Sequence, residues 1–233
     1  MKVAVCFSGT VRTPDNGLES LKLIFPNDDV KVFGHTWVNL NGEKDWANSN
    51  LEVNRGTNFS LLEKFNFETL LVESYNTKKI HFQKMYDFFN FKLHDSPPRT
   101  DLGIISMFYS IYQSNYLKRK YETLNKLKFD KVIRIRFDSN FENKNLDLKN
   151  ILGDLCIPHG NDWCGGINDQ FAIGSSESMD IYCDLYNSFS MIRHMPYHPE
   201  SILGEYLKIR NIQISRFDFN VSISSSRLSW DQR

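Results

Sequence analysis

Residues that could bind phosphate follow the first apolar run of the sequence. This run, at 2–7, is Lys-Val-Ala-Val-Cys-Phe, and the stretch after it, 8–13, is Ser-Gly-Thr-Val-Arg-Thr. A glycine lets a ligand approach the backbone closely, while hydroxyl groups and a guanidinium bind phosphate oxygens. The pattern is neither a Walker A loop nor a GxGxxG fingerprint, so a plain turn with an exposed arginine is the alternative. The candidates for contact with a phosphate or pyrophosphate are Ser8, Gly9, Thr10 and Arg12.

A second group of candidates surrounds the end of the alternating run 131–137. A carboxylate just past a buried strand is well placed to hold a Mg²⁺ or Mn²⁺ ion that bridges a diphosphate. Asp138 supplies such a carboxylate and Asn140 a carbonyl oxygen, so both are candidate metal ligands. Arg134 and Arg136 fall on one face of the run, and burying them without partners costs several kcal/mol. They indicate a functional pocket, unless the run is an edge strand that faces solvent.

A third candidate, Asp169, follows the flexible pair 165–166, Gly-Gly, and precedes the apolar run 171–174. A carboxylate in this position can reach an acceptor hydroxyl as a general base, or orient it by hydrogen bonding. The alternative is that Asp169 only caps a turn. His35, at the end of the apolar run 30–36, could contact a ligand or be a structural group.

The hydrophobic pattern predicts the elements that would position these residues. Short apolar or alternating runs predict strands, and apolar positions spaced three and four apart predict helices. Strands are expected at 2–7, 30–36, 68–73, 131–137, 155–158 and 170–174, with one or two more within 212–224. Helices are expected at about 16–25, 80–91, 101–124, 175–189 and 199–209. The polar stretch 40–60 is expected to be a long loop or a flap, and it is the natural candidate for a lid.

Strands alternate with helices in the first half of this order and become mixed in the second. Such an order predicts an α/β fold with an open mixed sheet flanked by helices, in which ligands bind at the carboxyl ends of strands. The chain has 233 residues and no internal repeat or linker, so 1–233 is expected to form a single domain.

Composition narrows the class of partner. The 28 basic and 28 acidic residues cancel, which argues against a nucleic-acid partner because phosphate neutralisation requires a basic surplus. No apolar run is long enough for a membrane span, and the N-terminal run turns polar too soon for a signal peptide, so a cytoplasmic protein without an integral membrane segment is expected. The four cysteines form no CxxC pair, which argues against structural zinc.

Four segments of the chain carry a resemblance to a known family. They are VAVCFSGTVRT, VFGHTW, FDKVIRIRFD and NDQFAIGSSESMDIY, in this order within residues 3–207. In order and spacing they resemble a group of small bacterial and viral glycosyltransferases with the GT-A fold. The resemblance implies that the run from Ser8 to Arg12 lies against the nucleotide and that the run from His35 to Trp37 lies near its base or ribose.

The same resemblance assigns roles to the two aspartates. It places Asp138 at the metal-binding DxD-like motif, and it places Asp169 at the acceptor or in the role of the base. Here Asn140 replaces the second carboxylate of the motif, so the affinity for a metal should be lower, and Arg134 or Arg136 can supply part of the positive charge.

The function expected from these observations is sugar transfer. A nucleoside-diphosphate sugar would be the donor, a glycan or a lipid-linked molecule the acceptor, and Mn²⁺ or Mg²⁺ the assisting metal. The alternative is a non-catalytic nucleotide- or glycan-binding module with the same fold, which the asparagine in the DxD-like motif favours. A sulfotransferase is a weaker alternative because the lysine-bearing loop usual at the start of that fold is missing.

Overall fold

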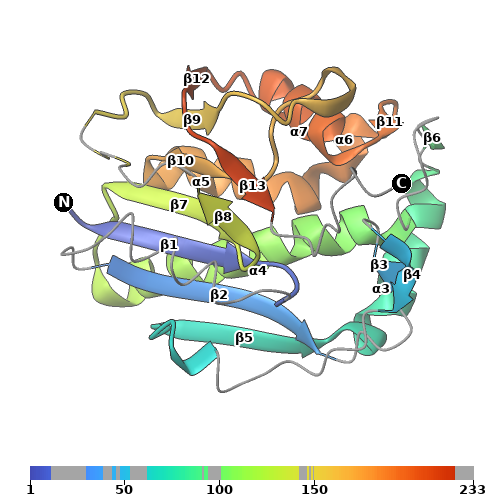
Figure 1. The fold of residues 1–233 in the computed structure, drawn as a ribbon, viewed down its shortest axis with the longest axis horizontal. Helices are drawn as coiled ribbons and strands as arrows, with labels where there is room; N and C mark the ends of the chain where they lie inside the picture. The colour runs from blue at the N-terminus through green and yellow to red at the C-terminus, as the bar shows by residue number, and fades with distance from the viewer. Residues whose placement is uncertain are drawn as a thin grey trace, which may run out of the picture.

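A seven-stranded sheet forms the centre of the computed structural model (Figure 1). The structure describes residues 1–11, 30–38, 62–90, 101–141, 146, 148 and 150–223, and the backbone alone of three short strands, β3 (Lys44–Asp45), β4 (Asn48–Glu52) and β6 (Lys92–Leu93). Arg12, the helix predicted at 16–25 and most of the stretch 40–60 lie outside the described residues. Within that stretch, β3 and β4 pair as antiparallel strands, and a lid role stays a prediction.

The strands of the main sheet are ordered β12-β9-β10-β7-β1-β2-β5. Their bounds are Val3–Ser8 for β1, Val30–Val38 for β2, Thr69–Ser74 for β5, Lys131–Arg136 for β7, Leu155–Pro158 for β9, Ala172–Gly174 for β10 and Ile214–Phe217 for β12. Neighbouring strands are parallel except at β10, which is antiparallel to both β7 and β9. The expected α/β fold with an open mixed sheet is therefore confirmed at this level, and the arrangement is compatible with a Rossmann-like fold.

The strand order places a topological switch point beside β1. From β1 the chain moves outward to β2 and β5, and then returns to place β7 on the other side of β1. Consecutive connections therefore leave β1 in opposite directions, and α/β proteins bind their ligands at the carboxyl ends of the strands that flank such a point, here β1 and β7. The loops that follow these two strands carry the phosphate and metal candidates.

Helices cover the sheet and link its strands (Figure 1). They are α3 (Tyr75–Phe89), α4 (Asp101–Asn125), α5 (Ser176–Cys183), α6 (Phe189–Ile192) and α7 (Pro199–Ile209), with single 3-10 segments η1 (Trp163–Gly165) and η2 (Asp184–Ser188). The long helix α4 packs across β1, β2 and β5, and α5 packs against β7 and β10. The remaining described strands are β8 (Ser139–Phe141), β11 (Pro196–Tyr197) and β13 (Val221–Ile223). β8 pairs with β13, and β11 pairs with β6.

The two faces of the sheet have separate apolar cores. Alternation along β1 sends Ala4 and Cys6 toward the core shared with α4, while Val5 and Phe7 enter the opposite core. On β7 the face shared with α4 also carries Arg134, so that face becomes polar toward the carboxyl ends of the strands. Near the carboxyl ends of β1 and β7, the face of the sheet toward α4 therefore carries polar groups, and the opposite face carries phenylalanines.

Most predicted elements are confirmed, and two helices differ in extent. Helix α3 starts at Tyr75 rather than at residue 80, because the Tyr75 ring packs edge-on against Trp37, at 5.7 Å, and extends the apolar contact by a turn. The helix predicted at 175–189 begins as expected, with Ser175 Oγ accepting from the Ser178 N–H at 3.2 Å, but changes to a 3-10 segment after Cys183. No helix in the described part of the chain has the length and apolar character needed to cross a membrane.

Candidate functional site

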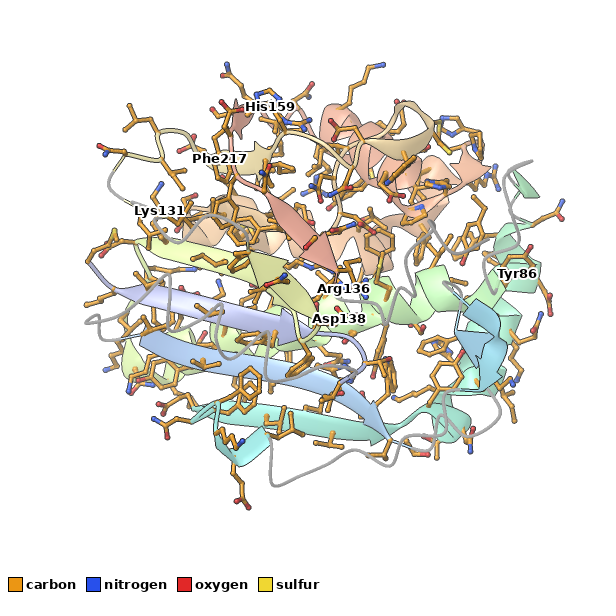
Figure 2. The ribbon with its side chains drawn as sticks, viewed as in Figure 1. Tyr86, Lys131, Arg136, Asp138, His159 and Phe217 are labelled. Carbon is orange, nitrogen blue, oxygen red and sulfur yellow. The ribbon has the colours of Figure 1, made fainter. Side chains whose placement is uncertain are left out.

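The candidate site lies where β1 and β7 end side by side. In the register of the sheet, Ser8 is opposite His35 of β2 on one side and opposite Arg136 of β7 on the other. Figure 2 shows Arg136 and Asp138 together at this end of β7, with Lys131 at the opposite end of the strand. Residues predicted from three separate segments of the sequence are thus brought to one edge of the sheet.

The turn after β1 has the conformation that its glycine predicts. Gly9 has a φ of +107°, a region that side chains other than glycine rarely adopt. A Cβ atom at this position would meet no heavy atom within 4 Å among the described residues, so none of these residues blocks the approach of a ligand on that side. Ser8 is buried, and its Oγ has no hydrogen-bond partner in the described part of the chain. A buried hydroxyl of this kind is a group that a ligand could satisfy.

Arg136 and Asp138 form a bidentate ion pair. The Arg136 Nε and Nη2 groups donate to the two carboxylate oxygens of Asp138 at 2.7 and 2.8 Å. Asp138 is 1% exposed, while the Arg136 side chain keeps 16% of its surface accessible. The carboxylate therefore holds the guanidinium in a fixed orientation at the surface of the site.

As arranged here, Asp138 and Asn140 do not fit a divalent-metal site. Both oxygens of Asp138 accept from Arg136, whose charge cancels the negative charge that a cation needs. Asn140 is exposed on β8, whereas Asp138 is buried, so the two side chains are in different environments. Within the described residues, no three His, Cys, Asp or Glu side chains are grouped so that they could hold a metal. Among the described residues, Arg136 supplies a cation beside Asp138.

Arg134 is a buried cation on the same strand. It is 1% exposed in a central strand, so the edge-strand alternative is wrong. Its Nη1 donates to the backbone oxygen of Asp169, while its Nε has no partner among the described residues. Burial lowers the pKa of the guanidinium, with the Tyr182 and Asp169 groups acting in the opposite direction. Arg134 fixes the loop that carries Asp169.

The reversed direction of β10 brings Asp169 to the site. Because β10 is antiparallel to β7, with Ala172 opposite Arg134, the residues just before β10 lie at the edge where β7 ends. The turn itself is capped by the neighbouring residue: Asn168 Oδ1 accepts from the Gln170 N–H at 2.8 Å. Asp169 is 5% exposed, and a role toward an acceptor stays a prediction.

His35 and Trp37 point into the core that lies under the site. His35 is fully buried, and its Nε2 lies 3.1 Å from Glu73 Oε2. The Trp37 ring packs between aromatic side chains, edge-on to His35 and stacked on Tyr109 at 5.5 Å. Neither side chain presents a surface to solvent, so contact of either one with a nucleotide stays a prediction.

Glu73, at the end of β5, is the centre of a polar cluster. Its Oε2 accepts from the Tyr109 hydroxyl at 2.7 Å, and its Oε1 lies 3.2 Å from Lys78 Nζ. The hydrogen bond from His35 is the main cause that lowers the pKa of Glu73 from 4.5 to about 2, against the opposing effect of burial. Burial in turn lowers the pKa of His35, which is therefore neutral at neutral pH.

This cluster was not predicted from the sequence. Glu73 was expected only at the end of the strand 68–73, and Tyr109 lies within the helix expected at 101–124. The available signal was position: Glu73 ends a parallel strand next to β2, so its carboxylate belongs to the same edge as His35. Ser110 Oγ contacts both the Gly9 N–H and His35 Nδ1, and so joins this cluster to the loop after β1. No pattern in the sequence indicates this role.

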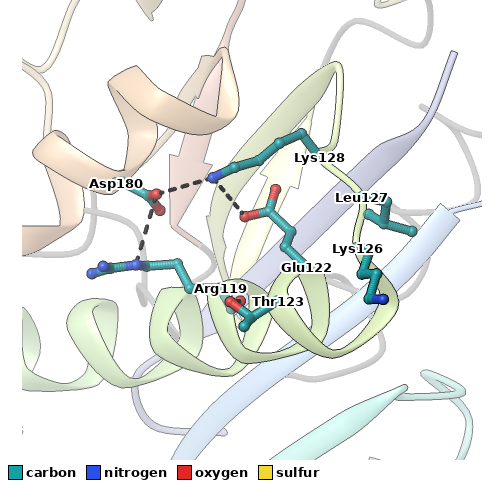
Figure 3. A pocket seen from close by; sticks show the side chains of 7 residues that line it. All are labelled: Arg119, Glu122, Thr123, Lys126, Leu127, Lys128 and Asp180. Atoms are coloured by element: carbon teal, nitrogen blue, oxygen red, sulfur yellow. Dashed lines mark hydrogen bonds and ion pairs between the residues drawn. The ribbon is translucent and has the colours of Figure 1, made fainter.

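Two hollows on the described surface lie away from the switch point. One, of about 230 Å³, is at the amino end of β7, where Arg119 and Lys128 surround Asp180 and Glu122 (Figure 3). Its two carboxylates are already paired with cations, with Lys128 Nζ 3.3 Å from Glu122 and Arg119 Nε 3.7 Å from Asp180. A second, of about 510 Å³, lies beside α3 and is lined largely by aromatic rings.

Comparison of the chain with models of known protein families finds no match. A search of curated proteins also finds no match.

Proposed function

We propose that the chain is a glycosyltransferase of the GT-A type that uses a nucleoside-diphosphate sugar. The observation that carries the proposal is the convergence at the switch point of an open glycine turn, an unsatisfied buried hydroxyl and an arginine held by a buried carboxylate. A diphosphate is an anion that matches the hydroxyl and the arginine, and a backbone without side chains lets it approach closely. The four-segment resemblance to glycosyltransferases supports the same assignment.

The residues divide into a donor side and an acceptor side. On the donor side, Ser8 and Arg136 bind the diphosphate, and the accessible part of the guanidinium donates hydrogen bonds that stabilise the charge on the departing nucleoside diphosphate. On the acceptor side, Asp169 orients an acceptor hydroxyl or removes its proton. The acceptor is a glycan or a lipid-linked molecule.

Arg136 takes the position that a metal would occupy in the DxD-like motif. Its charge beside Asp138 favours diphosphate binding that needs no Mn²⁺ or Mg²⁺. A metal could bind only if Asp138 exchanged the guanidinium for the cation, so a metal requirement would show that this exchange takes place.

A non-catalytic binding module is the second candidate. The same ion pair favours it, because Asp138 is neutralised and Asn140 lacks the second carboxylate of the motif. Both candidates predict binding of a nucleotide sugar, but only the transferase releases the nucleoside diphosphate with time.

Calorimetric titration tests the proposal. Nucleoside diphosphates and their sugars are titrated into the protein in Mn²⁺ and in EDTA, and release of the nucleoside diphosphate is followed separately with candidate acceptors. We expect one nucleotide family to bind in both media, and Arg136→Ala to weaken that binding roughly ten- to a hundredfold because a charge-assisted hydrogen bond is lost.

Two further variants make the test specific. Arg136→Lys keeps the charge that neutralises Asp138 but loses the planar fork, so it separates phosphate recognition from folding. Arg119→Ala removes a half-exposed arginine at the opposite edge of the sheet and is the matched control. Absence of binding by every nucleotide, or equal affinities for the Arg136 and Arg119 variants, would contradict the proposed site.

A further inference from the structure

A chain of hydrogen bonds crosses the protein from the loop after β1 to the end of β5. The Gly9 N–H donates to Ser110 Oγ at 2.7 Å, and this oxygen lies 2.8 Å from His35 Nδ1. His35 in turn contacts Glu73 through Nε2. The Gly9 N–H also lies 3.3 Å from the His35 backbone oxygen, which is the longer of its two contacts. Residues of a loop, a helix and two strands are thus joined in one line.

The direction of each hydrogen bond follows from the carboxylate at the end of the line. Ionised Glu73 only accepts, so His35 Nε2 carries the proton and Nδ1 is left as an acceptor. Ser110 then donates its hydroxyl proton to Nδ1, at 2.8 Å, rather than to the His35 backbone oxygen, at 3.2 Å, and its own oxygen accepts the Gly9 N–H. Every donor in the line has an acceptor, and each bond polarises the next in a buried environment.

We propose that Ser110, oriented by His35 and Glu73, is a positioning residue that clamps the loop 8–10 in its ligand-binding shape. The inference rests on the proposed function in that the ligand of this loop is taken to be a diphosphate. Gly9 holds a left-handed conformation that a free loop would populate only part of the time. A clamp from the middle of α4 removes this freedom before the ligand arrives, which lowers the entropic cost of binding.

The order Ser110–His35–Glu73 resembles a hydrolytic triad, but Ser110 is not a nucleophile. Its side chain is fully buried, and its oxygen already accepts the Gly9 N–H. No substrate atom can therefore reach it. Since this N–H is used within the protein, the loop must bind phosphate through other groups, one of which is the Ser8 hydroxyl, which has no partner among the described residues.

The experiment compares two serines of α4. Ser110→Ala removes the clamp, whereas Ser114→Ala removes an equally buried hydroxyl whose one hydrogen bond within the described residues goes to the Ile111 oxygen of its own helix. The ¹H–¹⁵N resonance of Gly9 and the dissociation constant of the nucleoside diphosphate are measured for both variants. We expect Ser110→Ala alone to move the Gly9 resonance upfield and to weaken binding about three- to tenfold, the effect of one lost hydrogen bond.

The outcomes separate this inference from the proposed function. An unmoved Gly9 resonance in Ser110→Ala, or equal affinities for the two variants, would overturn the clamp. If the wild-type protein binds no nucleotide, the proposed function fails, while the Gly9 resonance still decides whether the clamp exists. Should Ser110→Ala not fold, Glu73→Gln replaces it, because loss of the carboxylate frees His35 to change tautomer and must also move the Gly9 resonance.

Discussion

At the scale of single residues, Glu73 and His35 determine how the fold responds to acid. The pKa of Glu73 is about 2 in the folded protein against 4.5 in an unfolded chain, so its contribution to stability is complete above pH 4.5 and is lost as pH falls toward 2. The pKa of His35 lies below 6.5, so its contribution is lost first, as pH falls below 6.5. The groups that face the carboxylate are His35 of β2, Lys78 of α3 and Tyr109 of α4.

We predict that Glu73→Gln is less stable than the wild-type protein at pH 7 and that the difference shrinks as pH falls from 4.5 toward 2. The reason is that the wild-type carboxyl becomes protonated over this range and then resembles the amide. Urea unfolding of both proteins at several pH values measures the difference. A difference that stays constant with pH would show that Glu73 has an ordinary pKa.

Burial also separates the four cysteines in reactivity. Desolvation raises the pKa of Cys6 from 9.0 to about 12, and the pKa values of Cys156 and Cys183 are raised for the same reason. Cys164, at η1, is exposed. Because the thiolate is the reactive form, we predict one fast thiol in a reaction with an aromatic disulfide reagent and none in Cys164→Ser. More than one fast thiol in the native protein would contradict the burial of the other three.

At the scale of elements, a buried lysine joins α4 to α5. Lys118 Nζ lies 3.2 Å from Glu122 of its own helix, 2.8 Å from Asp180 of α5 and 2.7 Å from Ser176 Oγ. Burial opposes the charge, but the hydrogen bond to Asp180 and the neighbouring carboxylates raise the pKa of Lys118. The network fixes where α5 packs, and with it the strand β10 that precedes it.

We predict that Lys118→Met destabilises the protein by roughly 3 kcal/mol, because it leaves two carboxylates without their buried cation. The value lies at the low end for a broken buried pair because Lys128 and Arg119 still contact these carboxylates. Lys120→Met, at an exposed position of the same helix, should change stability by less than about 0.5 kcal/mol. Equal urea midpoints for the two variants would contradict the structural role of Lys118.

Elements were predictable where a local pattern determines them. The strand ending at Ser8 and the helix α7, with Pro199 at its first position, follow from the sequence because apolar periodicity and capping are local properties. The start of α3 was not predictable, since it depends on the packing of Tyr75 against a residue of β2.

The candidate site was also predictable only where a local pattern determines it. The loop residues could be identified from the sequence. The hydrogen bond between Gly9 and Ser110 could not, because it joins residues 101 positions apart and no local sequence pattern indicates it.

At the scale of the whole molecule, the strand order determines which predicted residues meet. The sequence predicted that Ser8, Asp138 and Asp169 follow or precede strands, but not that these strands are neighbours. Side-by-side placement depends on long-range pairing, which single-sequence patterns do not encode. The exposed Asn140 and the Arg136–Asp138 pair likewise became visible only once β7 and β8 were placed.

The single reversal of direction at β10 separates two kinds of loop. The segment 159–171, between β9 and β10, lies at the edge where β1 and β7 end, whereas the link from β10 to α5 lies at the far edge beside Lys118. Residues 159–160 and 162–165 of this segment are exposed, whereas Ile167, Asn168, Asp169 and Phe171 are buried. Under the proposed function, exchanges in the exposed part would alter the acceptor side while the turn after β1 and its anchoring helix stay as they are, but exchanges in the buried part would also disturb the fold.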